Sequence, residues 1–156
     1  MPKIDIDAVA RHTGSGYPPP FDKPCVGRSR RRLGDAGRLA DFGVNLLELP
    51  PGAWSSQRHW HSAEDEFVWV LEGDVILIDD AGEHPMHPGD CAAFAKGDPS
   101  GHHFVNRSDS LVRCLEIGSR RPDDDACDYP DVDLHVGPGR RAGYTRKDGT
   151  PYPTGR

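Results

Sequence analysis

A series of short apolar segments between residues 42 and 118 places the strongest constraint on the fold. Each segment is rich in Val, Leu, Ile or aromatic residues, and turn-forming sequences such as Pro50-Pro51-Gly52 and Pro88-Gly89-Asp90 separate them. No stretch of twelve residues in this region keeps the periodicity of a helix. The predicted strands span residues 42–49, 56–61, 66–73, 74–79, 91–95, 102–106 and 111–117. We therefore predict an all-β domain, built as an antiparallel sandwich or barrel.

The two ends of the chain have a different composition. Residues 17–21 read YPPPF, and proline fixes its own φ and cannot donate a hydrogen bond to a sheet. Asp123–Asp125 would repel one another in a helix. We predict an N-terminal arm over residues 1–41, a barrel over residues 42–118 and a C-terminal arm over residues 119–156, ordered, if at all, by packing on the barrel.

Charge excludes some classes of partner. Residues 51–118 contain four Lys and Arg against twelve Asp and Glu, which gives this segment a net charge of −8. Such a segment would repel a phosphate backbone, so we expect no nucleic-acid partner. The basic run Arg28, Arg30, Arg31 and Arg32 is more typical of a solvated arm than of an anion or phosphate contact.

The sequence also bears on location. No stretch approaches 18 apolar residues, and the first residues lack the apolar core of a signal peptide, so we expect a cytoplasmic protein with no membrane partner. The four cysteines show no CxxC spacing and are expected to be reduced thiols. Cys91 and Cys114 lie in apolar runs and are predicted to be buried.

Histidines mark the candidate site, since six of the eight lie between residues 59 and 103. His59 and His61 are two apart in a predicted strand, so both imidazoles should lie on one face and reach a single ion. Glu66 should open the partner strand beside them, and His102 is a third candidate histidine. Gln57 shares their parity and should face the same cavity, either orienting a ligand or metal-bound water or serving as a wall residue.

Two motifs resemble those of the cupin superfamily. Gly52…His59-Trp60-His61…Glu66…Gly73 is similar to the first cupin motif, and Gly89-Asp90…Gly97…His102…Asn106 is similar to the second. The chain also resembles a narrower group of small bacterial single-domain cupins, labelled as candidate sugar-phosphate isomerases. The resemblance implies a jelly-roll barrel, or double-stranded β-helix. It also implies one divalent metal ion bound by His59, His61, Glu66 and His102.

The sequence departs from the cupin pattern in three places. Six residues rather than five separate Gly52 from His59, and Ala95 stands where proline is usual. Two extra residues precede His102, which makes His103 an alternative ligand. Strand parity favours His102.

Three imidazoles and a carboxylate suit Fe, Mn, Ni or Zn. Open coordination positions would let a small hydroxy-carbonyl compound bind, and we expect a metal-dependent isomerase. The alternatives are a metal-dependent dioxygenase and a non-catalytic protein that binds or senses a small molecule. No catalytic base is evident, because Glu66 is a candidate ligand and no other carboxylate is expected to point inward. Glu64 and Asp65 are expected in a solvated turn.

If the metal ligands point inward, the residues that alternate with them point outward. These are Trp60, Phe67, Trp69 and Leu71. An apolar patch of this kind on a barrel surface typically marks an interface. We expect a second subunit, in a two-fold homodimer, or the terminal arms to cover it.

Overall fold

The computed structural model describes residues 3–140 and 143–153; the predicted arms extend beyond these at residues 1–2 and 154–156, and residues 141–142 also lie outside them. Strands pair antiparallel throughout and form three sheets. The largest has six strands in the order β1 (Arg11–Thr13), β2 (Ser29–Arg32), β3 (Phe42–Leu49), β10 (Val112–Ser119), β5 (Glu66–Glu72) and β8 (Cys91–Phe94).

Two smaller sheets complete the architecture. One contains β7 (Gly82–Met86), β6 (Val75–Asp79) and β9 (His103–Val105), and the other contains β12 (Leu134–Val136), β11 (Cys127–Tyr129) and β4 (Trp60–His61). The helices are short: α1 (Leu33–Ala36), η1 (Ile6–Ala8), η2 (Lys23–Cys25) and η3 (Pro138–Arg140). None of the helices in the described parts of the chain has the length and apolar character needed to cross a bilayer.

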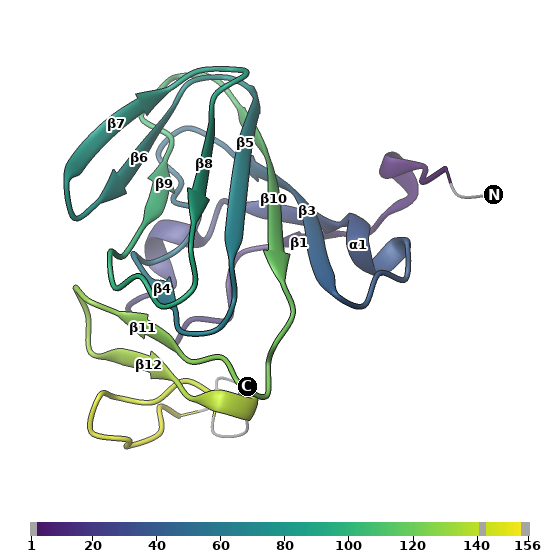
Figure 1. Cartoon of the computed structure of the whole chain (residues 1–156). Helices are drawn as coiled ribbons and strands as arrows, with labels where there is room; N and C mark the ends of the chain where they lie inside the picture. The colour runs from purple at the N-terminus through teal and green to yellow at the C-terminus, as the bar shows by residue number, and fades with distance from the viewer. Residues whose placement is uncertain (1–2, 141–142, 154–156) are drawn as a thin grey trace.

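The β7–β6–β9 sheet faces the large sheet, and the main core fills the space between them (Figure 1). Alternation along the strands decides which side chains enter it: Val68 and Val70 of β5 are buried, whereas Trp69 between them is 46% exposed. The cluster also includes Leu47, Leu49, Val75, Leu77, Met86, Phe104, Val112 and Cys114. This arrangement is the all-β jelly-roll sandwich that the strand pattern predicts.

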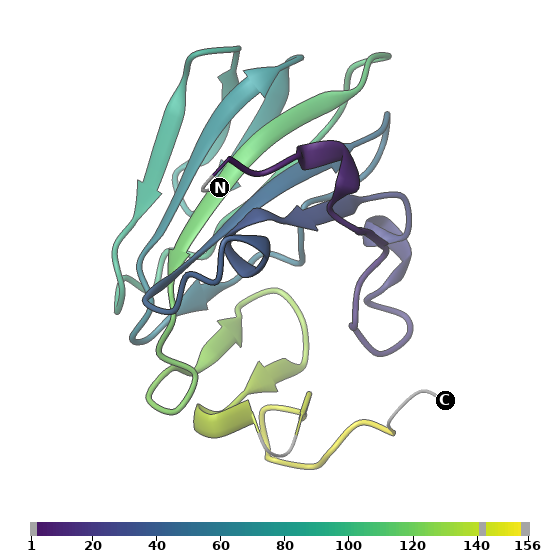
Figure 2. The same cartoon turned by 90° about the vertical axis from the view of Figure 1, so that its right-hand side faces the viewer.

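A second apolar cluster lies where the two terminal segments meet. It contains Tyr17 and Cys25 from the N-terminal segment and Cys127, Tyr129 and Leu134 from the C-terminal segment. Figures 1 and 2 show the C-terminal segment packed across the lower end of the sheets. The terminal segments are therefore more structured than their composition indicates. Their aromatic side chains form a small core, although the sequence there has no strand pattern that would predict one.

The arginine run is part of the barrel, so the prediction of a solvated arm is wrong. Residues 29–32 form β2, which pairs with β3. Arg28 is buried and donates to the backbone carbonyls of Gly14 and Ser55. Main-chain pairing brings this polar sequence into the sheet, since ladder hydrogen bonds need no apolar side chain.

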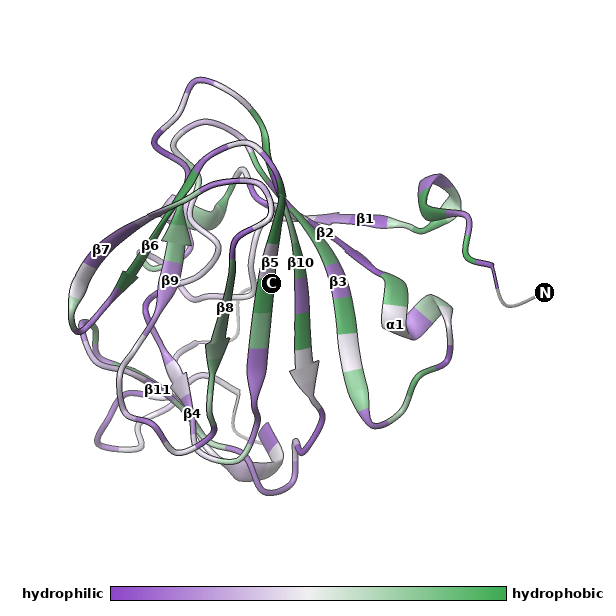
Figure 3. Cartoon of the chain, turned by 45° about the horizontal axis from the view of Figure 1, so that its top comes forward, coloured by the Kyte–Doolittle hydropathy of each residue, from purple (hydrophilic) through white to green (hydrophobic). Residues whose placement is uncertain are grey.

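The outer face of the large sheet carries exposed apolar side chains. Trp69 and Leu71 are 46% and 45% exposed with the described parts of both terminal segments in place, which confirms their predicted outward orientation. Leu115 lies opposite Trp69, and Figure 3 shows hydrophobic colour along β5, β10 and β3. Cys91 also lies on this face, opposite Trp69, and is exposed, so the prediction that it is buried is wrong. Its neighbour Ala92 takes the inward position.

Candidate metal centre

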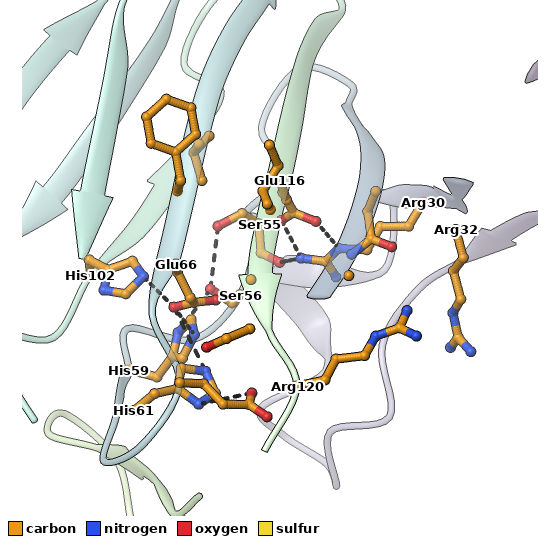
Figure 4. A pocket seen from close by; sticks show the side chains of 18 of the residues that line it. Arg30, Arg32, Ser55, Ser56, His59, His61, Glu66, His102, Glu116 and Arg120 are labelled. Atoms are coloured by element: carbon orange, nitrogen blue, oxygen red, sulfur yellow. Dashed lines mark hydrogen bonds and ion pairs between the residues drawn. The ribbon is translucent and has the colours of Figure 1, made fainter. Parts of the chain in front are cut away.

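Three imidazoles converge on one carboxylate oxygen at one end of the barrel (Figure 4). The Nε2 atoms of His102, His59 and His61 lie 2.9, 3.5 and 3.7 Å from Oε2 of Glu66. Glu66 opens β5 and His61 ends β4, while His59 and His102 face each other across an isolated antiparallel bridge. The structure therefore gathers the four residues that the sequence selects as metal ligands.

Hydrogen bonds behind the cluster orient His59 and His61. Nδ1 of His59 lies 2.9 Å from the carbonyl oxygen of Gln57. Because a carbonyl can only accept, Nδ1 of His59 carries a proton, and Nε2 is the ring nitrogen that faces Glu66. Nδ1 of His61 lies 2.6 Å from Oδ2 of Asp125, a buried carboxylate that also accepts from the backbone N–H of Ala63. Carboxylates and carbonyls in this position orient metal-binding histidines.

His102 is held by stacking instead. The ring of Phe94 lies parallel to its imidazole, with ring centroids 3.4 Å apart, and Nδ1 of His102 is buried without a hydrogen-bond partner among the described residues. The neighbouring His103 points elsewhere, since its Nδ1 donates to the carbonyl of Ser56 and its ring packs against Trp54. Of the two alternatives, His102 is therefore the one that reaches the cluster.

The electrostatics of the cluster suit a cation. Burial raises the pKa of Glu66, but the imidazoles of His102 and His59 lower it further, so its pKa lies well below the ordinary value and it is a carboxylate. Burial lowers the pKa of His102 below its ordinary value, which favours the neutral ring that a metal ligand must be. Burial also lowers the pKa of His59, but the Glu66 carboxylate offsets this and raises it above the ordinary value.

The donor set passes a simple chemical test for a metal ion. Oε2 of Glu66 is buried and has no properly oriented hydrogen bond within the described chain. Around it stand three nitrogen donors, and nitrogen with one carboxylate oxygen is the ligand set of first-row transition ions. His59, Glu66 and His102 place one ligand atom each within 4.8 Å of one another.

A cavity of about 610 Å³ opens on this cluster. Its wall carries five arginines and four carboxylates, an excess of one positive charge in a chain whose net charge is −6. The charged residues are Arg28, Arg30, Arg32, Arg120 and Arg140, with Asp35, Glu64, Glu66 and Glu116. A polar cavity beside a metal-type cluster can hold a small hydrophilic molecule.

The predicted role of Gln57 in this cavity is wrong. Its side chain is buried, and its amide nitrogen donates to the carbonyl of Phe21 at 2.7 Å. Residues 55–58 form bends rather than a regular strand, so period-two parity does not extend from His59 back to Gln57. Gln57 contributes its backbone carbonyl, which orients His59.

Sequence reasoning missed two carboxylates of the candidate site, Glu64 and Asp125. Glu64, expected in a solvated turn, is buried and lines the cavity, and its Oε1 accepts from the backbone N–H of Arg121. Asp125 lies 64 residues from His61 along the chain. A metal-binding histidine usually donates its second N–H to an acceptor, so an acceptor for His61 could have been expected. That rule does not say which residue of the sequence supplies the acceptor.

The β-sandwich with an inward cluster of three histidines and one glutamate places the chain among small β-barrel proteins with a candidate metal centre. Comparison with known sequences then gives the family: a cupin domain profile matches residues 45–118. A protein from Silicibacter pomeroyi, described as a sugar phosphate isomerase from a cupin superfamily, is 52% identical over 97% of both chains, with a TM-score of 0.90. The chain belongs to the cupin superfamily.

Two further solved structures are similar. A protein from Acidithiobacillus ferrooxidans, described as a candidate sugar phosphate isomerase, is 31% identical over 76% of this chain and 74% of its own, with a TM-score of 0.70. The polyketide cyclase RemF from Streptomyces resistomycificus is 24% identical over 76% of this chain and 79% of its own, with a TM-score of 0.60. That last similarity shows the fold alone. No functionally curated protein matches the chain.

Proposed function

We propose that this chain is a metal-dependent isomerase of a small hydroxy-carbonyl compound of the sugar-phosphate type. The observation that carries the proposal is the convergence of three imidazole nitrogens on Oε2 of Glu66 beside a polar cavity. The 52% identity to a protein described as a sugar phosphate isomerase supports the same reaction class.

His59, His61, Glu66 and His102 would hold one divalent ion, Fe, Mn, Ni or Zn. Such an ion acts as a Lewis acid that polarises a carbonyl oxygen. The chain's own part is to keep these side chains in place before substrate arrives. Gln57 and Asp125 do this for two histidines through hydrogen bonds, and Phe94 does it for the third by stacking.

Isomerisation also needs a base that removes a proton from the carbon beside the carbonyl and returns one to the carbonyl carbon. Glu66 belongs to the ligand cluster, Asp35 is paired with Arg120, and both oxygens of Glu116 accept from Arg30. Glu64 is the remaining carboxylate on the cavity wall. Its Oε2 lies 3.4 Å from Arg140 and 3.9 Å from Nδ1 of His61, both longer than the ion-pair distances of Glu116, and we assign Glu64 as the base.

The test is an isomerisation assay in D2O. Protein reconstituted with Mn, Fe, Ni or Zn is incubated with ribose 5-phosphate, and NMR follows ketose formation and loss of the proton at C2. Ketose and proton exchange that depend on the metal support the proposal. Oxygen uptake that needs both substrate and iron would make the protein a dioxygenase. Binding without turnover of ribose 5-phosphate or other hydroxy-carbonyl phosphates, with any of the four metals, would leave a non-catalytic binding protein.

A further inference from the structure

The cavity has a basic side that the isomerase chemistry does not use. Arg30 and Arg32 are two apart on β2 and share its inner face, while Arg120 follows directly after β10. Figure 4 shows these three guanidinium groups on the side of the cavity away from the histidines. The inference drawn from them rests on the proposed function, since it concerns the other end of the same substrate.

The three arginines differ in how firmly they are held and in how many donors remain free. Arg30 makes a two-pronged ion pair with Glu116, at 2.6 and 2.7 Å. Arg120 uses its two terminal nitrogens on Leu39 and Asp35, which leaves Nε without a partner in the described chain. The guanidinium of Arg32 has no hydrogen-bond or ion-pair partner among the described residues. The wall therefore combines two arginines that are held in place with donors that remain free on Arg32 and on Nε of Arg120.

Net charge favours an anionic guest here. The excess of one positive charge on the cavity wall becomes three when a divalent ion joins the cluster. The surrounding protein is acidic, with a net charge of −6. A cleft lined by net positive charge focuses the electrostatic field inside it. Small anions therefore bind in this cleft in preference to the acidic outer surface of the protein.

The sheet sets the distance between the two ends of the cavity. Glu66 stands on β5 and Arg32 on β2, three strands apart through β10 and β3. At about 4.8 Å per strand, the backbones are about 14 Å apart along the sheet. Between them the floor is Gly118 and Gly43, and a side-chain carbon on Gly43 would be in ordinary contact with Nε of Arg120, at 3.5 Å. Because glycine has no side chain, these two residues add none to the lane, the stretch of cavity between the histidine cluster and the guanidinium groups.

We infer that Arg32 and Arg120, with Arg30 behind them, bind the phosphate group of a phosphomonoester whose hydroxy-carbonyl end lies at the His–Glu cluster. Guanidinium groups match phosphate in both charge and geometry. The length of the lane selects a substrate in which several carbons separate the phosphate from the carbonyl. A carbonyl compound without phosphate would lose this second anchor.

The experiment measures binding of glycerol 3-phosphate by calorimetry, to metal-loaded protein and to protein stripped with a chelator. The variants are Arg32→Met and Arg120→Met. The control is Arg107→Met, which removes one charge from a surface pair with Glu83 outside the cavity. Arg32 is exposed and unpaired in the described chain, so its replacement leaves the fold intact.

Each cavity variant should weaken binding about tenfold or more, whereas Arg107→Met stays within twofold of the parent protein. Binding should persist without metal, and acetate should bind far more weakly. Three results would each overturn the inference. The first is unchanged affinity for glycerol 3-phosphate in both cavity variants, and the second is loss of its binding when the metal is removed from the parent protein. The third is binding of acetate as tight as that of glycerol 3-phosphate. Arginine-dependent binding with no isomerisation of sugar phosphates would keep the subsite and refute the proposed function. If both variants isomerise ribose 5-phosphate as fast as the parent protein, the proposed function stands and the phosphate subsite is refuted.

Discussion

Replacement of Asp125 by Asn tests whether the hydrogen bond behind His61 tunes the metal centre. The carboxylate accepts twice, from Nδ1 of His61 at 2.6 Å and from the N–H of Ala63 at 2.9 Å. The side-chain amide of Asn has one oxygen that accepts and one NH2 group that donates. Either Nδ1–H of His61 or the backbone N–H of Ala63 must therefore face the NH2 group. If that donor is His61, its proton moves to Nε2, the nitrogen that faces Glu66.

The expected magnitude follows from this loss. Replacing a group that orients a metal-bound histidine weakens metal binding about 10- to 100-fold, which corresponds to about 1.4 to 2.7 kcal/mol. Metal affinity is measured by competition with a chromophoric chelator, and circular dichroism monitors the fold. Asp124→Asn is the matched control, because Asp124 is exposed one residue away and is expected to leave affinity unchanged. A folded Asp125→Asn protein that binds metal within twofold of the parent would refute the reasoning.

Three further predictions follow from other parts of the structure. Glu64→Gln should lower isomerase turnover about 100-fold or more while the metal content by elemental analysis stays the same; full turnover would remove Glu64 as the base. Trp69→Asp on the outer sheet face should weaken a homodimer roughly thirtyfold or more, so that light scattering gives the mass of a monomer. A parent protein that is already monomeric would show that no second copy covers this face. Cys91 alone should react with a thiol reagent at pH 8, because burial raises the pKa of Cys114 and Cys127 to about 12 and that of Cys25 above its ordinary value; more than one reactive thiol before unfolding contradicts this.

The parts of the site that the sequence predicted are those governed by local rules. His59 and His61 are two apart at the end of one segment, and Glu66 follows after a short turn, so parity and turn length determine their relation. His102 required the resemblance to the second cupin motif, because a ligand from a distant strand has no local signal. The jelly-roll sandwich was predictable from strand length and turn spacing, since each strand lies beside a strong turn sequence.

The parts that the sequence did not predict depend on contacts between distant segments. Asp125 reaches His61 only because β11 pairs with β4, and Glu64 is buried because the chain at Arg121 passes over it. Arg28 and Arg30 enter the cavity wall because β2 joins the large sheet. In each case a charged residue in a polar sequence is buried or half-buried by a distant part of the chain, and composition alone assigns such residues to the surface.

The chain divides its chemistry between two kinds of segment. All four candidate ligands lie within residues 45–118, which the cupin profile matches, whereas Asp125, Arg32 and Arg120 lie outside it. Under the proposed function, changes in the flanking segments would therefore alter the affinity for the ion and the choice of substrate while the main core packing stays the same. A graft of the flanks of one such protein onto the barrel of another would transfer Arg32, Arg120 and the acceptor behind His61, whereas the contacts that orient His59 and His102 would stay with the barrel.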